Sequence, residues 1–256
     1  MAREIEDAER DIARNVAIAT TTFYKNDEVG KVRSELALRT IDSALERGYH
    51  VSIVDGGSFD EFLKSLERSG ADVRPEEQGG MGPGRRQAFR AAYDSERKVV
   101  AWTEPEKYTY IPDLWNTAKP VLDGIADLVI PDRGSLESYP KGQQYAEYLG
   151  NLAFADITGF PLDMWSGGRT FGRDNTHYFT DYNGEYGDKW DSIFIPVLDM
   201  IHDDKSVIGV KIYYNHPPEM TAIEVGKPFF HVKRVDQLTN LVPALHTHWE
   251  KLKARN

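Results

Sequence analysis

The sequence predicts an α/β fold in which a mostly parallel, Rossmann-like sheet is flanked by helices. Apolar, β-rich runs alternate with helical patterns over residues 16–132, as in proteins with parallel strands and crossover helices. Most of these runs end in polar or glycine-rich residues, where ligands of open parallel sheets bind. The composition, 40% hydrophobic and 28% charged in 256 residues, is that of a globular protein with a sizeable core.

The first half of the chain repeats a strand-and-helix unit. A charged segment with apolar residues at helical spacing, 2–14, predicts a short helix before the repeats. The β-rich runs at 16–23 and 50–58 predict strands. The helices after them end at Gly48 and Gly70, because glycine is common where helices stop. Two such units in succession indicate a parallel sheet.

The same alternation continues to residue 132. A short strand near 72–74 leads to a glycine-rich stretch, 78–93, which opens into an alanine-rich helix. The run 98–107 predicts a strand that ends in two acids. A helix around 113–126 and a strand at 126–132 complete the alternation, so we expect parallel strands joined by crossover helices.

Beyond about residue 140 the pattern becomes irregular. The expected elements are an aromatic helix near 141–154, a Gly-, Trp- and Arg-containing segment at 163–173, a helix at 193–201, a strand at 206–214 and a closing helix at 235–253. No repeat, low-complexity tract or linker marks a boundary. We therefore expect residues 1–256 to form a single domain.

Charge and cysteine content exclude several function classes. The formal net charge is −10, which argues against a nucleic-acid surface because binding phosphates needs clustered cations. Cysteine is absent, which excludes disulfides, zinc–thiolate sites and a cysteine nucleophile. The sequence has neither a signal peptide nor an apolar run of the roughly 18–20 residues that a membrane helix needs. We therefore expect a cytoplasmic protein without a transmembrane segment.

The ends of the first two strands carry candidate ligand-binding residues. Thr20 and Thr22 close the first strand, and Asp55 and Gly56 follow the second. A carboxylate there accepts hydrogen bonds from a nucleobase or ribose, and a glycine lets the ligand approach the backbone. The alternative is that Asp55 is a turn or N-cap acid, which a lone Asp-Gly pair favours.

A compact glycine- and arginine-containing stretch precedes the next helix. Its candidate residues are Gly82, Gly84, Arg85 and Arg86. Backbone amides, the positive end of a helix and guanidinium groups together suit a diphosphate. An ordinary flexible loop with solvated arginines is the alternative, because glycine-rich signals are weak.

Glu104 and Glu106 follow the fourth predicted strand. One intervening residue puts both carboxylates on the same side of an extended chain, where they could share one divalent ion that bridges two phosphates. Carboxylate oxygens suit Mg²⁺ or Mn²⁺, which would stabilise a departing diphosphate. A pair of solvated surface acids is the alternative.

Taken in order, these segments resemble glycosyltransferase family 2 and its relatives, including enzymes similar to dolichol-phosphate mannose synthase and glucosyl- or mannosyl-3-phosphoglycerate synthase. The matching segments are VDGGSFDE (54–61), GPGRRQAFRAA (82–92), AWTEPEK (101–107), ADLVIPDR (126–133), DMWSGGRTFGRD (163–174) and DKWDSIFIPVLDMIHDDKSVIGVKIYYNHP (188–217). The resemblance implies a GT-A fold with a nucleotide-sugar-binding half at 15–133, an acceptor and catalytic half at 134–234 and a closing helix at 235–256.

The resemblance also implies an activity. It is that of a glycosyltransferase, a hexosyltransferase that moves a sugar from a UDP- or GDP-linked donor to a small-molecule or lipid-phosphate acceptor, assisted by Mg²⁺ or Mn²⁺. An inverting outcome is expected, and a homodimer is compatible with it. The alternatives are a retaining transferase of the glucosyl- or mannosyl-phosphoglycerate synthase type, a sugar nucleotidyltransferase and a non-catalytic nucleotide-sugar-binding protein.

Site residues follow from the matched motifs. Asp55 matches the base-binding acid, Glu104 and Glu106 fall at the family's Asp-x-Asp metal motif, and His216 matches a late histidine that would be a third metal ligand. Glutamates in place of aspartates leave open a shifted metal, a single carboxylate ligand or no metal. The nucleotide-sugar-binding set is Thr20, Thr22, Asp55, Gly56, Gly82, Gly84, Arg85, Arg86 and Glu104.

The second half supplies the predicted catalytic and acceptor residues. An inverting transfer needs a base for the acceptor hydroxyl, and the resemblance places Asp191 there, with Asp163 as the second choice. A helix N-terminal acid is the alternative for Asp191. The acceptor-binding residues are expected to be Trp165, Ser166, Gly167 and Arg169, of which the arginine would hold an acidic acceptor.

Overall fold

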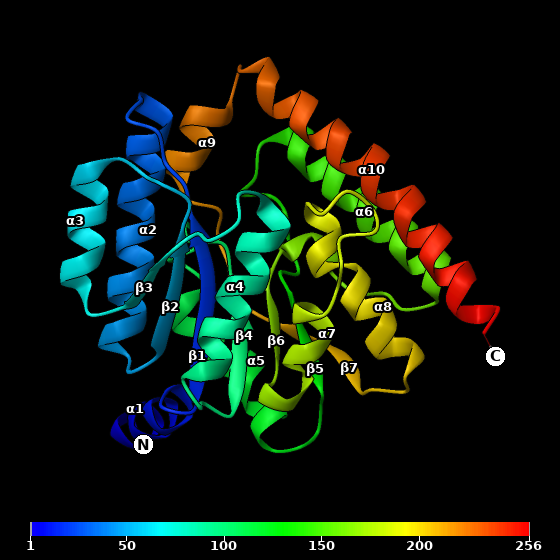
Figure 1. The fold of residues 1–256 in the computed structure, drawn as a ribbon, viewed down its shortest axis with the longest axis horizontal. Helices are drawn as coiled ribbons and strands as arrows, with labels where there is room; N and C mark the ends of the chain where they lie inside the picture. The colour runs from blue at the N-terminus through cyan, green and yellow to red at the C-terminus, as the bar shows by residue number, and fades with distance from the viewer. Residues whose placement is uncertain (1, 256) are drawn as a thin grey trace.

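The computed structural model describes residues 2–255, with side chains from residue 7 onward. Within them, seven strands form one sheet in the order β3-β2-β1-β4-β6-β5-β7 (Figure 1). The strands are β1 (Val16–Thr22), β2 (His50–Asp55), β3 (Asp72–Pro75), β4 (Val99–Trp102), β5 (Leu128–Asp132), β6 (Arg169–Gly172) and β7 (Val207–Lys211). Every pair runs parallel except the two that β6 makes, so the predicted mostly parallel sheet is confirmed.

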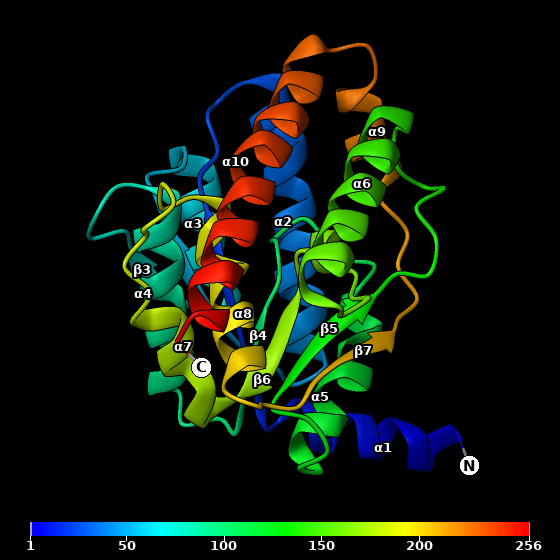
Figure 2. The same cartoon turned by 90° about the vertical axis from the view of Figure 1, so that its right-hand side faces the viewer.

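Helices flank both faces of this sheet (Figures 1 and 2). They are α1 (Ala2–Ala13), α2 (Glu28–Glu46), α3 (Asp60–Ser69), α4 (Met81–Asp94), α5 (Leu114–Leu122), α6 (Lys141–Thr158), α7 (Thr176–Thr180), α8 (Ile195–His202), α9 (Pro218–Glu224) and α10 (Pro228–Lys253). Alternate residues of β1 contribute side chains to two apolar cores, one on each face of the sheet. Val16 and Ile18 pack with α2, α3 and α5, whereas Ala17 and Ala19 pack with α4, α6, α8 and α10. Burial on both faces explains why the strands read as continuous apolar runs.

One strand in the second half was not predicted. Residues 169–172 form β6, which lies antiparallel between β4 and β5, with Val100 opposite Phe171 and Val129 opposite Thr170. The sequence of β6, RTFG, contains one apolar residue and lies outside the regular strand-and-helix alternation from which the equally short β3 was predicted. The insertion of β6 brings the segment before it, 163–168, to the same edge as the residues that follow β4 and β5.

Several predicted boundaries shift, and three of them bear on the site or the closing helix. The helix α4 begins at Met81, so the glycine-rich stretch lies in its first turns rather than in a preceding loop. The strand β4 ends at Trp102, before the two glutamates. The closing helix α10 begins at Pro228 rather than near residue 235. Over residues 2–255, none of the helices has the length and apolar character needed to cross a membrane.

Candidate functional site

Asp55 anchors the turn after β2. Its Oδ1 accepts hydrogen bonds from the backbone N–H groups of Gly57 and Ser58, both at 2.8 Å. Its Oδ2 accepts from the hydroxyls of Thr22 at 2.7 Å and Ser58 at 2.6 Å. A carboxylate offers about four acceptor positions, so these donors leave none for a nucleobase. The geometry therefore corresponds to the alternative interpretation of Asp55, that of a turn acid.

Thr20 and Gly56 also contact the protein itself. The hydroxyl of the buried Thr20 donates to the carbonyl of Thr103 at 2.9 Å. A Cβ on Gly56 would lie 3.1 Å from Oε2 of Glu76, and one on Gly84 would lie 2.7 Å from its Oε1. Glycine at both positions therefore lets the unanticipated Glu76 carboxylate lie between the end of β2 and α4. Burial raises the pKa of Glu76.

A segment from the second half covers the start of α4. The N–H of Gly82 donates to the carbonyl of Asp188 at 2.9 Å, and a Cβ on Gly82 would lie 1.8 Å from Asp188 Oδ1. Arg86 donates to both oxygens of the same carboxylate, at 2.5 and 2.7 Å. Asp188 thus places a negative charge beside the helix N-terminus, where anions are favoured and where the sequence predicts a diphosphate.

Arg85 is buried beneath this covering segment. It donates to the carbonyl of Lys189 at 2.8 Å and to the hydroxyl of Ser192 at 3.1 Å. Its guanidinium lies 5.2 Å from the ring centroid of Trp102, and burial lowers its pKa to about 10. In this arrangement Arg85 holds residues 189–192 and is not open to a diphosphate.

Glu104 lies beyond the carboxyl end of β4, against the segment that precedes β6. It forms an ion pair with Lys107 at 3.0 Å, and a Cβ on Gly167 would lie 3.5 Å from its carboxyl carbon. The side chain is 51% exposed, so part of the carboxylate is open to a ligand. Desolvation by the surrounding protein raises the pKa of Glu104, but the charges of Lys107, Lys233 and Arg234 and the hydrogen bond from Lys107 together outweigh it and hold that pKa well below its usual range.

Glu106 has different partners. The prediction that Glu104 and Glu106 lie on the same side of an extended chain is wrong. Because β4 ends at Trp102, the chain turns before it reaches Glu106. The buried carboxylate accepts hydrogen bonds from the Tyr24 hydroxyl and from Arg33 Nε, both at 2.8 Å. Arg33 Nη2 lies 2.7 Å from the same oxygen. Glu106 therefore ties α2 to the end of β4, and the two glutamates are separated.

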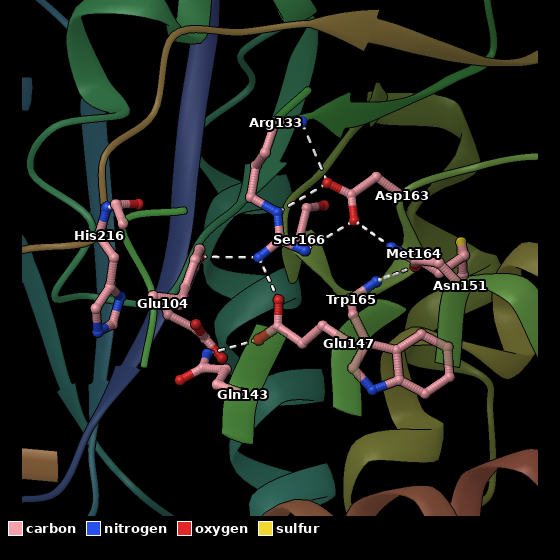
Figure 3. Close-up of polar contacts among 12 residues, drawn as sticks. Glu104, Arg133, Gln143, Glu147, Asn151, Asp163, Met164, Trp165, Ser166 and His216 are labelled. Carbon is pink, nitrogen blue, oxygen red and sulfur yellow. Dashed lines mark hydrogen bonds and ion pairs between the residues drawn. The ribbon is translucent and has the colours of Figure 1, made fainter. Parts of the chain in front are cut away.

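Arg133, directly after β5, is the centre of a buried ionic network (Figure 3). Its guanidinium donates to both oxygens of Asp163 at 2.8 Å and to Glu147 at 2.5 Å. Asn151 also donates to Asp163 at 2.7 Å. Burial raises the pKa of Asp163, but the hydrogen bonds and charge of Arg133 outweigh it and lower that pKa. Such an acid is a weak proton acceptor, so the geometry does not favour Asp163 as a base.

Asp191 is also engaged within the chain. Its side chain accepts hydrogen bonds from the Tyr182 hydroxyl at 2.6 Å, from the N–H of Lys189 at 2.6 Å and from the N–H of Asp188 at 3.2 Å. The residue is only 2% exposed. Asp191 thus fixes the turn at 188–191 and has little surface left for an acceptor hydroxyl.

The predicted acceptor segment divides into two pairs. The Trp165 ring packs against Gly150 of α6, and Arg169 is fully buried. The Arg169 guanidinium donates to three backbone carbonyls, those of Met164, Gly168 and Ile193. Burial lowers the pKa of Arg169 to about 9. These two residues belong to the core, whereas Ser166 and Gly167 lie beside Lys107 and Glu104.

Three buried side chains near Glu104 keep polar atoms without a hydrogen-bond partner among the described residues. The atoms are the Ser166 hydroxyl, Oε1 of Gln143 and both ring nitrogens of His216, and these side chains are drawn in Figure 3. Buried atoms of this kind are uncommon, because leaving them unpaired costs free energy. They indicate a place where the protein retains binding capacity for a ligand.

His216 has the properties of a neutral ligand. Its ring stacks on Tyr139 with centroids 4.3 Å apart. Burial, followed by the charges of Lys107 and Arg234, lowers the pKa of His216 to about 3. The imidazole is therefore uncharged at neutral pH and has a lone pair free for a metal ion or a hydrogen-bond donor.

The first turns of α10 bring two cations to this region. Arg234 lies 3.9 Å from Glu224 of α9. Lys233 makes no ion pair with the described residues, and burial followed by the charges of Arg234 and Arg33 lowers its pKa. The charges of Glu104 and Glu106, which follow β4, act in the opposite direction and raise the pKa of Lys233.

Two of the three predicted metal ligands have atoms available for a divalent ion. Among residues 2–255, no group of three or more histidine and carboxylate side chains could hold a metal by itself. Glu104 and His216 are the predicted ligands that keep free atoms. An ion bound to a nucleotide diphosphate takes most of its ligands from phosphate and water. Two protein ligands therefore fit a metal that binds with its diphosphate, and Glu106 does not contribute.

Two hollows differ in their suitability for a ligand. A cavity of about 10 Å³ behind Ser166 and Lys107 has room for about one water, so a sugar must lie on the open side of Glu104. A hollow of about 530 Å³ is lined by Lys98, Asp127 and Ser206, which precede β4, β5 and β7. It lies at the amino ends of the strands, where ligands of open parallel sheets are not expected.

Several residues of the site were not anticipated. Lys107 and Arg133 follow strands, so the strand-end rule could have identified both. Glu147 and Lys233 lie within helices, and Asp188 lies in a turn, far along the chain from the residues that they face. Only the folded chain brings these three to the same edge of the sheet.

No known protein family and no curated protein matches the sequence significantly. Solved structures of glucosyl-3-phosphoglycerate synthase from Mycobacterium tuberculosis are similar in fold. The complex with Mn²⁺, UDP and phosphoglyceric acid has a TM-score of 0.57 at 16% identity, over 87% of this chain and 79% of that one. The complex with Mn²⁺, UDP and glucosyl-3-phosphoglycerate has a TM-score of 0.57 at 15% identity, over 91% and 84%. The chain therefore has the fold of the GT-A glycosyltransferases, as the sequence predicts.

Proposed function

We propose that this chain is a glycosyltransferase that moves a hexose from a uridine diphosphate donor to a small acceptor bearing a phosphate or carboxylate. The observation that carries the proposal is the set of free polar atoms on Ser166, Gln143 and His216 beside the half-exposed Glu104. The synthases with this fold have been solved with UDP-glucose and phosphoglyceric acid, which supports UDP-glucose as the first donor to test.

Glu104 and His216 would hold Mg²⁺ or Mn²⁺ together with the diphosphate. When bound, the metal supplies positive charge for the oxygens of the departing diphosphate. Lys107 keeps Glu104 ionised, as the lowered pKa of that carboxyl indicates. The neutral imidazole of His216 needs to lose no proton before it binds.

An anionic acceptor is supported by the cations at this edge. Lys233 is half-buried and has no ion-pair partner among the described residues, and partial desolvation, which lowers its pKa, disfavours the unpaired ammonium. A phosphate or carboxylate on the acceptor would remove that cost. The Ser166 hydroxyl would donate to or accept from the same molecule. The acceptor-binding arginine of the sequence prediction, Arg169, is replaced in this role by Lys233 and Arg234.

Retention at the anomeric carbon is the outcome that the geometry supports. Inversion needs a free base, but Asp191 accepts three hydrogen bonds and Asp163 is paired with Arg133. In a retaining transfer, the electron pair of the C–O bond goes to the phosphate oxygen of UDP. That oxygen can take the proton of the acceptor hydroxyl as its oxygen bonds to the anomeric carbon.

A binding experiment tests the donor and metal site. We expect UDP to raise the melting temperature, and Mn²⁺ to increase that shift, because ligand that binds only the folded state stabilises it. Glu104→Gln should abolish the effect of Mn²⁺. Glu106→Gln is the matched control, since it should lower stability while the Mn²⁺ effect remains. Dependence on Glu106 instead, or no shift with UDP or GDP, would contradict the proposed site.

Turnover is the second test. Release of UDP from UDP-glucose should require 3-phosphoglycerate or another anionic acceptor, and NMR of the product should show the donor's anomeric configuration. A β-linked product would mean inversion, so the retaining assignment would be withdrawn. UDP binding without turnover on any anionic acceptor would favour the alternative of a non-catalytic nucleotide-sugar-binding protein.

A further inference from the structure

The outer face of α6 is apolar where a surface helix is normally polar. Tyr145 is 71% exposed, Tyr148 66%, Leu149 54% and Leu152 45%. These four residues, named here the α6 stripe, are spaced so that they lie on one face of the helix. Figure 2 shows α6 beside α10 along one side of the molecule. On the opposite face of α6, Gln143 and Glu147 point into the candidate site.

Charges lie only at the two ends of this face. Lys141 stands before the stripe and Asp156 after it, and both are exposed. Between them the only charged residue is Glu147, which is buried on the other face. Neither Lys141 nor Asp156 forms an ion pair with the described residues. The two charges are about 22 Å apart along the helix.

We propose that the α6 stripe pairs with the α6 stripe of a second copy of this chain, the two helices running antiparallel about a two-fold axis. With the axis between residues 148 and 149, Tyr148 of one copy faces Leu149 of the other and Tyr145 faces Leu152. The same register places Lys141 opposite Asp156. One arrangement therefore covers all four apolar residues and pairs both end charges, as an isologous interface requires.

The neighbouring helix extends the patch. Phe229, Val232 and Val235 of α10 are also exposed, and a Cβ on Gly142 of α6 would lie 2.6 Å from the His231 ring, so the two helix starts adjoin. Aromatic side chains bury roughly 150–250 Å² each, which brings two such faces to the approximately 1,000 Å² or more of a specific interface. A membrane surface is the weaker candidate, because membrane-binding helices are flanked by several cations and this stripe ends in an acid.

Sedimentation velocity of the full chain over a range of concentrations tests the pairing. We expect a monomer–dimer equilibrium that Leu149→Lys weakens at least about tenfold, because it places two like charges near the axis. Ile125→Lys is the matched control, since Ile125 is 63% exposed and lies outside the stripe. A wild-type chain that stays monomeric, or a dimer that Leu149→Lys leaves unchanged, would overturn the proposal.

Charge reversal tests the antiparallel register. Lys141→Asp and Asp156→Lys should each weaken the dimer, and the double variant should restore it, because the charges then match again across the axis. Because the chain has no cysteine, Leu149→Cys should form a cross-linked dimer under mild oxidation, and Ile125→Cys should not. No rescue by the double variant would overturn the register. A monomer that binds anionic vesicles through Leu149 would overturn the proposal in favour of a membrane.

Discussion

Two parts of the same sheet edge use their polar residues in different ways. Around β1, β2 and α4, the predicted site residues mostly bond to the chain itself: Asp55 accepts four hydrogen bonds, Arg86 is paired with Asp188, and Arg85 is buried with its Nε unpartnered among the described residues. Around β4, β6 and the segment after β7, Ser166 and His216 keep free atoms. We call these regions the closed edge and the open edge. The comparison shows that an acid in a recognisable motif, such as Asp55, can stabilise a turn, whereas Ser166 and His216 keep atoms that are available to bind a ligand.

The largest expected effect comes from the ionic network beneath the open edge. Arg133→Met leaves Asp163 and Glu147 as two buried carboxylates without their cation, so we expect a loss of about 3–5 kcal/mol in the free energy of unfolding. Urea denaturation measures it. Arg86→Met on the closed edge is the control, at about 1 kcal/mol, because its ion pair is partly exposed. Equal losses would mean that the two regions do not differ in this respect.

Asp55→Asn tests the closed edge directly. The substituted amide would point a donor at the hydroxyl of Thr22 or Ser58, so we expect a loss of about 2 kcal/mol, typical of hydrogen bonds to a charged group. UDP affinity should change little at a temperature where the variant is folded. A stable variant that no longer binds UDP in calorimetry would restore the base-binding role that the resemblance implies.

Acid pH should lower the free energy of unfolding by protonating Asp163, which lies in the ionic network beneath the open edge. Its pKa is lowered in the folded protein, so its contribution to stability is full above the ordinary carboxyl pKa of about 4. The contribution is lost as the pH falls from there through the folded pKa, with a slope of up to about 1.4 kcal/mol per pH unit for one proton. Denaturation midpoints between pH 5 and 3 should fall less steeply in Asp163→Asn. Identical slopes would exclude this linkage.

The smallest expected effects have opposite signs at the two edges. Ser166→Ala removes a buried hydroxyl that has no hydrogen-bond partner among the described residues, so stability should stay constant or rise by up to about 1 kcal/mol, while acceptor affinity falls. Thr20→Val removes a buried hydroxyl that donates to Thr103, so stability should fall by about 1 kcal/mol. Thermal unfolding of both variants measures the pair. A destabilising Ser166→Ala would mean that the hydroxyl serves the fold.

Much of the architecture could be predicted from local patterns. The apolar runs at 16–23 and 50–58 became β1 and β2, because strands buried on both faces need continuous apolar residues. β6 could not be predicted, since RTFG has one apolar residue, lies outside the regular strand-and-helix alternation, and takes its place from pairing with β4 and β5. The sequence also predicts Glu104, Ser166 and His216 as candidate site residues, and the structure brings these three to the same region.

The amino-acid sequence by itself determined the α/β class, the order of most strands and helices and the residue types available at the strand ends, because periodicity and turn chemistry act over a few residues. Only the tertiary structure decided which polar groups are free. Whether Asp55, Glu106 and Asp191 can meet a ligand depends on donors and cations such as Thr22, Arg33 and Tyr182, several of which are far away in sequence. Whether a polar group can bind a ligand therefore depends on the hydrogen-bond and ion-pair partners that folding places beside it.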